Sequence, residues 1–185
     1  MDNGAGSYRR FLDGDDDGIV EIIRDYKDGL ILYLNSFTGN IHCAEELMEE
    51  TFVKLVTRKP GFRGKCSFKT WLYAIGRNVA IDYLRHNSKI SGTPIEDYAD
   101  LAAEEESMEQ AYLKEERRIF LHRALARLNP EYRQVLYLIY FEDFDNAGAA
   151  TVMRKSRRQM ENLIYRAKRS LKSELEKEGF VYEGL

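Results

Sequence analysis

The 185-residue chain is poor in the residues and runs that mark several protein classes. Two cysteines are too few for a disulfide framework, so we expect a reducing interior. No apolar run approaches the ~18 residues of a membrane-spanning helix, and no charged-then-apolar secretory leader opens the chain. We therefore expect a cytoplasmic protein without membrane insertion. Few prolines, with 44% hydrophobic and 32% charged residues, favour a foldable, largely helical chain over a disordered or collagen-like one.

Motifs for catalysis and metal binding are missing or incomplete. Residues 13–18 fit the first half of a calcium-binding loop, but Arg24 stands where a bidentate Glu is needed, and we expect no helix before the loop. Cys43 and Cys66 form no Cys-x-x-Cys motif, and the three histidines lie in unrelated segments. There is no Gly-rich phosphate loop and no Ser/His/Asp grouping. The sequence predicts no enzyme, no metal site and no cofactor.

The net charge of −3 conceals a strong alternation of charge along the chain. Residues 1–50 carry four basic and twelve acidic groups, whereas residues 51–92 carry nine basic and one acidic. Residues 93–118 are acidic again, and residues 154–172 carry eight basic and one acidic group. A polyanion responds to the local field more than to the total charge, so two basic zones on helical patterns favour a nucleic-acid partner.

Apolar residues recur at helical spacing almost throughout, and no segment shows the sustained alternation of a strand. The spacing predicts helices over about 19–37, 44–56 and 67–86, the last capped by Ser67. A helix over about 108–128 follows, and Pro130 after Asn129 opens another. Two further helices are predicted over 146–153 and 156–178.

Residues 88–107 break this helical pattern with Ser, Gly, Thr and Pro, followed by an acidic run without an apolar face. Such composition is typical of a flexible interdomain linker. The predicted fold is therefore all-α, with two small helical domains, residues 1–87 and 108–185, joined by this acidic linker. Each half is long enough to bury a small core by itself.

The C-terminal basic zone has the pattern of a helix-turn-helix. Residues 144–171 predict a helix, a tight turn at Arg154 and Lys155, and a second helix capped by Ser156. The outward face of this second helix carries guanidinium, amide and hydroxyl groups, which are the kind that read base edges in the major groove. These residues are Arg157, Arg158, Gln159, Asn162, Tyr165, Arg166, Lys168 and Arg169. A generic basic helical hairpin is the alternative interpretation.

The first basic zone interleaves aromatic with basic residues between positions 62 and 85. Phosphate neutralisation combined with aromatic stacking suits unpaired bases better than a closed duplex. Phe68, Trp71 and Leu72 would also form an ordinary core, so we expect about half of these aromatics to be buried.

These segments resemble a known bacterial family. Residues 38–55, 62–64 (FRG) and 67–85 (SFKTWLYAIGRNVAIDYLR) closely resemble conserved region 2 of the group 4, or extracytoplasmic-function (ECF), sigma factors. Residues 128–136 (LNPEYRQVL) and 144–171 resemble region 4 of the same factors. The resemblance covers residues 14–175, with two domains in the family's order.

The resemblance implies a sigma factor of the sigma-70 family that binds core RNA polymerase at its largest-subunit clamp and its flap. It would direct the polymerase to the −35 and −10 elements of promoter DNA and promote melting, in the bacterial cytoplasm, with an anti-sigma factor as a further partner. The polymerase-binding residues would be Glu46, Leu47, Glu50 and Phe52. The −10 contacts would come from Lys69, Trp71, Arg77, Asn78, Asp82, Arg85, His86 and Lys89, with Asn78 nearest the flipped base. The −35 contacts would come from Arg154, Lys155, Ser156, Arg157, Arg158, Gln159, Asn162 and Arg166.

Three residues depart from the family pattern. Arg154 stands in a turn that usually contains Gly, and a positive φ there would cost around a kcal/mol. Glu161 and Leu163 stand where the family often has basic residues, so the −35 sequence is not predicted. The alternatives are a stand-alone helix-turn-helix regulator, in which the Trp71-bearing region and the acidic helix have no role, and an inactive decoy that sequesters an inhibitor. Run-off transcription with core polymerase would separate the three.

Overall fold

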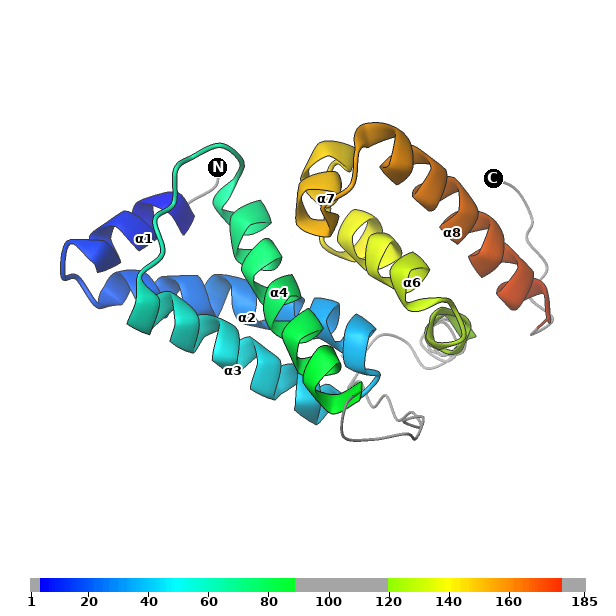
Figure 1. The fold of residues 1–185 in the computed structure, drawn as a ribbon, viewed down its shortest axis with the longest axis horizontal. Helices are drawn as coiled ribbons and strands as arrows, with labels where there is room; N and C mark the ends of the chain where they lie inside the picture. Colours follow the sequence, from blue (N-terminus) through cyan, green and yellow to red (C-terminus); the bar gives the residue numbers. More distant parts are fainter. Residues whose placement is uncertain (1–3, 89–119, 178–185) are drawn as a thin grey trace, which may run out of the picture.

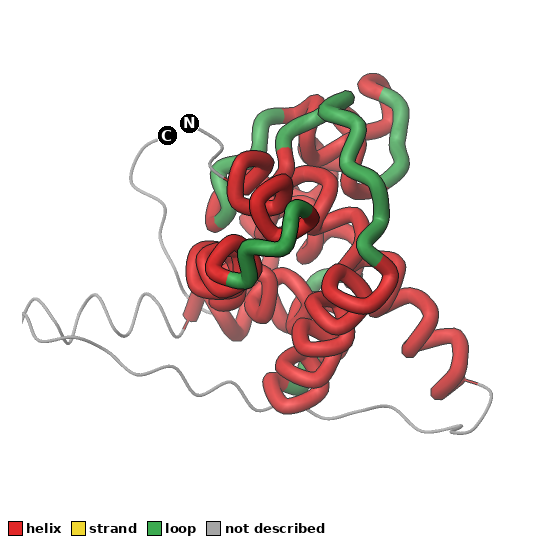
Figure 2. The backbone as a smooth tube through the Cα atoms, turned by 90° about the vertical axis from the view of Figure 1, so that its left-hand side faces the viewer, coloured by secondary structure: helices red, strands yellow, loops and turns green. Residues whose placement is uncertain are grey.

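The computed structural model describes residues 4–88 and 120–177, and its regular elements in these ranges are helices (Figure 1). The first domain contains four of them: α1 (Gly4–Leu12), α2 (Asp17–Thr38), α3 (Ile41–Arg58) and α4 (Phe68–Ser88). After a helical stretch at 120–126, the second domain contains α6 (Pro130–Leu136), the π-helix η1 (Tyr137–Phe141), α7 (Asn146–Met153) and α8 (Arg157–Lys177). The side view in Figure 2 shows these helices joined by loops, without a described strand. Among the described helices, none is long and apolar enough to cross a membrane.

The helix boundaries of the first domain follow from local capping. Gly39 adopts a left-handed conformation (φ 63°) and its N–H donates to the Asn35 carbonyl, which closes α2. The Asn40 side chain then accepts from the Cys43 N–H and starts α3. The Ser67 hydroxyl accepts from the Thr70 N–H (3.1 Å), so the predicted cap of α4 is confirmed.

An aromatic cluster joins the start of the chain to α4. The Tyr8 ring centroid lies 5.6 Å from that of Phe68 and 5.3 Å from that of Trp71, and Phe62 completes the cluster. Burial raises the pKa of Tyr8 to about 12, and its hydroxyl donates to the Pro60 carbonyl at 2.8 Å. These contacts explain why α1, which the apolar spacing did not predict, forms a helix and belongs to the core.

The turn between α1 and α2 corrects one expectation. No helix was predicted before residues 13–18, yet α1 ends at Leu12 and leads directly into that loop. Arg10 of α1 forms ion pairs with Asp15 and Glu21, so part of the acidic charge is neutralised within the chain. In the residues that the structure covers, no group of three or more His, Cys, Asp or Glu side chains could hold a metal ion.

The second domain uses the predicted caps. Pro130 occupies the first turn of α6, and the Asn129 side chain accepts from the Glu131 N–H. Ser156 and Gln159 form a capping box, in which the Gln159 N–H donates to the Ser156 hydroxyl and the Ser156 N–H donates to the Gln159 side chain. Arg154 has φ 53°, so the turn keeps its left-handed geometry without glycine.

The two domains are in contact, although the sequence pattern predicted no contact between them. Helix α4 packs against α7, while α2 packs against α6 and η1. Figure 1 shows α6, α7 and α8 together on one side of α4. Buried apolar residues of both domains belong to one contiguous cluster. Apart from Ser88 at the end of α4, the predicted linker 88–107 lies outside the described residues. The part of the predicted helix 108–128 that precedes residue 120 also lies outside them.

Candidate nucleic-acid interface

The predicted −10 residues do not share a single face of α4. At 100° per residue, Trp71, Asn78, Asp82 and Arg85 share one stripe, whereas Lys69 projects from the far side of the helix. Asp82 and Arg85 are exposed, and Trp71 and Asn78 are half-buried. His86 is exposed on the last turn of α4, and Lys89 lies outside the described residues. The structure therefore brings four of the eight predicted residues together on one face.

Arg77 lies on the side of α4 that faces α2. Its Nε is buried and has no hydrogen-bond partner among the described residues. The buried Tyr33 of α2 is close enough for the guanidinium charge to oppose the increase in its pKa that burial causes. Arg77 thus lies away from the face of α4 that carries Asn78, although the resemblance implies a −10 contact for both residues.

Lys69 is held by the second domain. Its Nζ lies 2.8 Å from the carbonyl oxygen of Glu142 and 3.0 Å from Oε2 of the same residue. The Tyr73 hydroxyl donates to that Oε2 at 2.5 Å. Burial, reinforced by the neighbouring carboxylate, raises the pKa of Tyr73 far above its usual value and keeps its hydroxyl protonated. Sequence reasoning missed Glu142 because no local motif marks it.

Helix α8 presents a polar stripe opposite its buried face. Met160, Leu163 and Ala167 are buried, and the helical period places a second set of side chains on the other side: Arg158, Asn162, Tyr165 and Arg169. All four are exposed, Tyr165 at 67%. The burial of Leu163 explains why it can replace a basic residue of the family pattern. Tyr165 and Arg169 thus join the predicted −35 set, and their place on the outward face was readable from the sequence.

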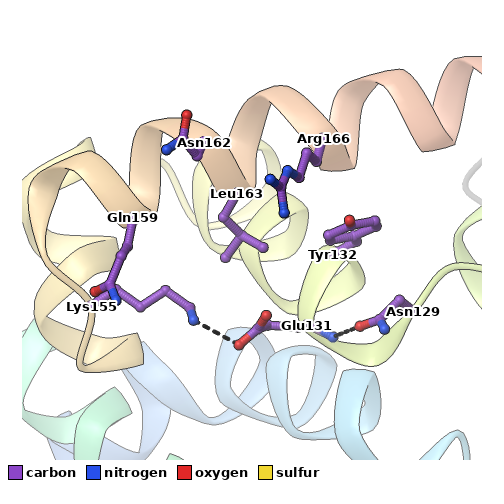
Figure 3. Close-up of a pocket in the computed structure, with 8 residues that line it drawn as sticks. All are labelled: Asn129, Glu131, Tyr132, Lys155, Gln159, Asn162, Leu163 and Arg166. Atoms are coloured by element: carbon purple, nitrogen blue, oxygen red, sulfur yellow. Dashed lines mark hydrogen bonds and ion pairs between the residues drawn. The ribbon is translucent and has the colours of Figure 1, made fainter.

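Three of the remaining −35 residues, Lys155, Gln159 and Arg166, line a pocket of about 310 Å³ between α6 and α8 (Figure 3). Lys155 donates to Glu131 at 2.7 Å, so its charge is already paired within the domain. Gln159, Asn162 and Arg166 line the same pocket. Arg157 lies at the edge of the stripe, where its Nε donates to Glu161 at 3.0 Å. Ser156 and Arg154 are exposed at the turn itself.

Helix α3 changes the predicted polymerase-binding set. Leu47 and Phe52 are only 2% and 5% exposed, because they face the core of the first domain. Neither side chain is available to a partner, and we correct their placement from surface to core. The solvent face instead carries Val53, which is 56% exposed, among three exposed carboxylates: Glu46, Glu49 and Glu50.

Comparison with known proteins gives a consistent result. The family model described as Sigma-70 region 2 matches residues 22–90, and the model described as Sigma-70, region 4 matches residues 118–171. RNA polymerase sigma factor YlaC of Bacillus subtilis (strain 168) is 27% identical over 162 residues, covering 87% of this chain and 94% of YlaC. ECF RNA polymerase sigma factor SigW of the same strain is 25% identical over 170 residues, covering 88% and 91% of the two chains.

Two solved structures share the fold. The sigma factor RpoE, solved in complex with the anti-sigma factor NepR from Bartonella quintana, gives a TM-score of 0.70 at 21% identity, over 84% of this chain and 95% of RpoE. CnrH, solved in complex with the cytosolic domain of CnrY, gives 0.64 at 20% identity, over 94% and 95% of the two chains.

The class is thus that of the RNA polymerase sigma factors, which act in promoter recognition. Both matched regions occur in one chain, in the order that the sequence predicted. The chain belongs to the sigma-70 family, in its ECF group.

Proposed function

We propose that this chain binds core RNA polymerase through α3, places α8 at the −35 element and α4 at the −10 element, and stabilises the melted DNA there. The observation that carries this proposal is the pair of polar stripes, one on α4 and one on α8, on two separate helical domains. The chain has no catalytic role of its own in this scheme. It works in the cytoplasm, where the polymerase is.

The α8 stripe supports duplex recognition. Arg158 and Asn162 project from the first turns of the helix, where a recognition helix contacts base edges. Arginine suits the acceptors of guanine, and asparagine suits adenine. Arg154 and Arg169, exposed at either end of the stripe, suit phosphates of the flanking backbone.

The α4 stripe supports capture of an unpaired base. The Asn78 amide can donate to and accept from a base edge, and Trp71 lies seven residues earlier on the same face. Trp71 is packed by Tyr8 and Phe62 but remains half-buried, so part of the indole is open to stacking. Such contacts favour separated strands, because the pairing edge and the face of a base are accessible to Asn78 and Trp71 only after the base has left the duplex.

The α3 surface supports a protein partner of opposite charge. Val53 provides an apolar centre, and the surrounding carboxylates favour a basic surface on the polymerase clamp. The RpoE and CnrH structures were solved with an anti-sigma factor and with a cytosolic domain of CnrY, respectively. We propose an anti-sigma factor as a partner of this chain as well.

Run-off transcription with purified core polymerase tests the proposal, combined with permanganate reactivity of −10 thymines. The wild-type chain should support initiation, and Asn78→Ala should retain polymerase binding but lower thymine reactivity on duplex templates. A premelted −10 bubble should restore part of the activity, because strand separation is then supplied in advance. Equal reactivity of both proteins on the duplex would refute the role of Asn78. DNA binding by a dimer without any effect on core polymerase would instead support a stand-alone regulator.

A further inference from the structure

We propose that Glu142 is an intramolecular latch, which holds the second domain against the first and occupies Lys69 until the chain opens. The inference rests on the proposed function, because opening matters only if the two domains must reach separate DNA elements. It concerns the contact of Glu142, the residue that follows η1, with Lys69 and Tyr73 of α4.

The Glu142 carboxylate is nearly buried and is held by two side chains of α4. The Glu142 side chain is 10% exposed and receives the Lys69 ammonium and the Tyr73 hydroxyl at the same oxygen. The Glu142 carbonyl oxygen accepts a second hydrogen bond from Lys69. Two of the three ammonium donors of Lys69 are thus directed at one residue of the other domain.

Aromatic rings complete the environment of the Lys69 ammonium. Nζ lies 5.1 Å from the centroid of Phe144 and 5.6 Å from that of Tyr73, within the range of cation–π attraction. The two rings lie 5.1 Å apart, so they join the domains as well. The Lys69 ammonium is therefore contacted by groups of the second domain and by a residue one turn along its own helix, while the Lys69 side chain remains 32% exposed.

Gly29 of α2 makes room for the latch. A Cβ atom at this position would lie 2.5 Å from both Glu142 carboxylate oxygens and 2.6 Å from the Tyr73 hydroxyl. Any side chain there would compete with the Glu142 carboxylate for its place. The closed state thus depends on a residue without a side chain in the middle of a helix, which is otherwise unfavourable for helix stability.

The backbone around Glu142 is irregular on both sides. The π-helix η1 ends immediately before it, and Asp143 has φ 52°, a left-handed conformation that non-glycine residues rarely adopt. Such conformations persist where surrounding contacts hold them. Hydrogen bonds within the second domain hold this segment, from the Glu142 N–H to the Tyr137 carbonyl and from the Phe144 N–H to the Leu138 carbonyl. Lys69 adds one hydrogen bond from the first domain, to the Glu142 carbonyl oxygen.

Geometry requires the closed state to open on a promoter. The −35 and −10 elements are named for positions about 25 base pairs apart, roughly 85 Å of B-form DNA at about 3.4 Å per base pair. The 21-residue helix α8 is only about 31 Å long, and α4 packs directly on α7. Domains in such contact cannot reach both elements at once. DNA phosphates also offer Lys69 the type of anionic acceptor that Glu142 now provides.

Two variants test the latch in the full chain without removing Lys69. Gly29→Ala adds a methyl group against the Glu142 carboxylate, and Glu142→Ala removes the carboxylate. Matched controls are Gly6→Ala, where an added Cβ meets nothing within 4 Å, and Glu176→Ala on the exposed face of α8. Far-UV circular dichroism checks that all four proteins retain their helices.

The first readout is the reactivity of lysine amines with acetic anhydride, followed residue by residue by mass spectrometry. Lys69 should react at least threefold faster in both latch variants, relative to the exposed Lys27 in the same molecule. Small-angle X-ray scattering should show a larger radius of gyration in both. Unchanged dimensions and unchanged Lys69 reactivity in Gly29→Ala and Glu142→Ala, with wild-type helicity, would overturn the proposal.

A second readout asks whether closure masks nucleic-acid binding. A fluorescent 20-nucleotide single-stranded DNA of mixed sequence should bind the opened variants about tenfold more tightly than the wild type at low salt. Opened variants with unchanged DNA affinity would overturn the masking role. Failure of the wild type to support initiation by core polymerase would count against the proposed function alone, because scattering and lysine reactivity do not depend on polymerase.

Discussion

Val53→Lys is the most direct test of the proposed polymerase-binding surface. Val53 is 56% exposed on α3, and Glu49 precedes it by four residues, so the new lysine gains a favourable pair of the Glu-to-Lys order. Surface substitutions of this kind usually change the free energy of unfolding by less than about 0.5 kcal/mol. The first domain should therefore remain folded.

The effect on binding should be larger than the effect on folding. Complete burial of a valine side chain contributes about 1.5–3 kcal/mol, and roughly half of the Val53 side chain remains to be buried by a partner. Losing that contribution, and placing a cation against a basic surface, should reduce affinity for core polymerase at least about tenfold, which corresponds to about 1.4 kcal/mol.

The assay is a fluorescence-anisotropy titration of labelled chain with core polymerase. Val20→Lys is the matched control, because Val20 is a 60% exposed valine on α2 that also follows acidic residues. It should bind like the wild type. Wild-type affinity of Val53→Lys, or an equal loss in Val20→Lys, would refute the reasoning. Leu47 is unsuitable for this test, since a charge at a 2% exposed core position would unfold the domain.

Three further outcomes are expected from the second domain and from the α1–α2 contact. Arg154→Gly should stabilise the second domain by about 1 kcal/mol in thermal melts, because glycine adopts the left-handed turn without a Cβ penalty, and it should weaken −35 DNA binding if the guanidinium contacts phosphate. Arg158→Ala should reduce −35-dependent transcription more than Arg157→Ala, because Arg157 is turned toward Glu161. The difference should correspond to the ~1–3 kcal/mol of a base contact. Equal losses would contradict the placement of Arg158 against a base. Hydrogen bonds from Arg10 and from Ser7 lower the pKa of Glu21 in the folded chain. The ionised Glu21 therefore stabilises the fold at pH values above its unfolded-state pKa, and this stabilisation is lost as the pH falls through its folded-state pKa. Glu21→Gln should flatten the acid side of a stability–pH profile, and an unchanged profile would show that the pair contributes nothing.

Local interactions made the helix boundaries predictable. Ser67, Asn129 and Ser156 each satisfy backbone N–H groups within three residues of themselves, so the sequence alone contains the necessary information. The inward apolar positions of α8 were predictable for the same reason, since a period of 3.6 residues fixes one face relative to the other. The resemblance indicated a turn that usually contains glycine at position 154, and Arg154 adopts the left-handed conformation there although its residue type disfavours it.

Contacts between distant residues were not predictable. Lys69 and Glu142 are separated by 73 residues, and nothing in either local sequence indicates the pairing. The same limit hid α1, whose Tyr8 and Phe11 are buried by contacts made elsewhere in the chain. The family resemblance placed Leu47 and Phe52 at a polymerase-binding surface, whereas the structure buries both in the core of the first domain.

The two faces of α4 explain how one helix can serve both closure and promoter melting. Lys69 and Asn78 project about 180° apart at 100° per residue, so a single strand lying along one face cannot contact both. In the closed state Lys69 is engaged by Glu142, while Asp82 and Arg85, on the Asn78 face, remain exposed. Substitutions at the two positions should therefore act differently. A loss at Lys69 should alter the balance between closed and open chain, whereas a loss at Asn78 should alter base capture after opening.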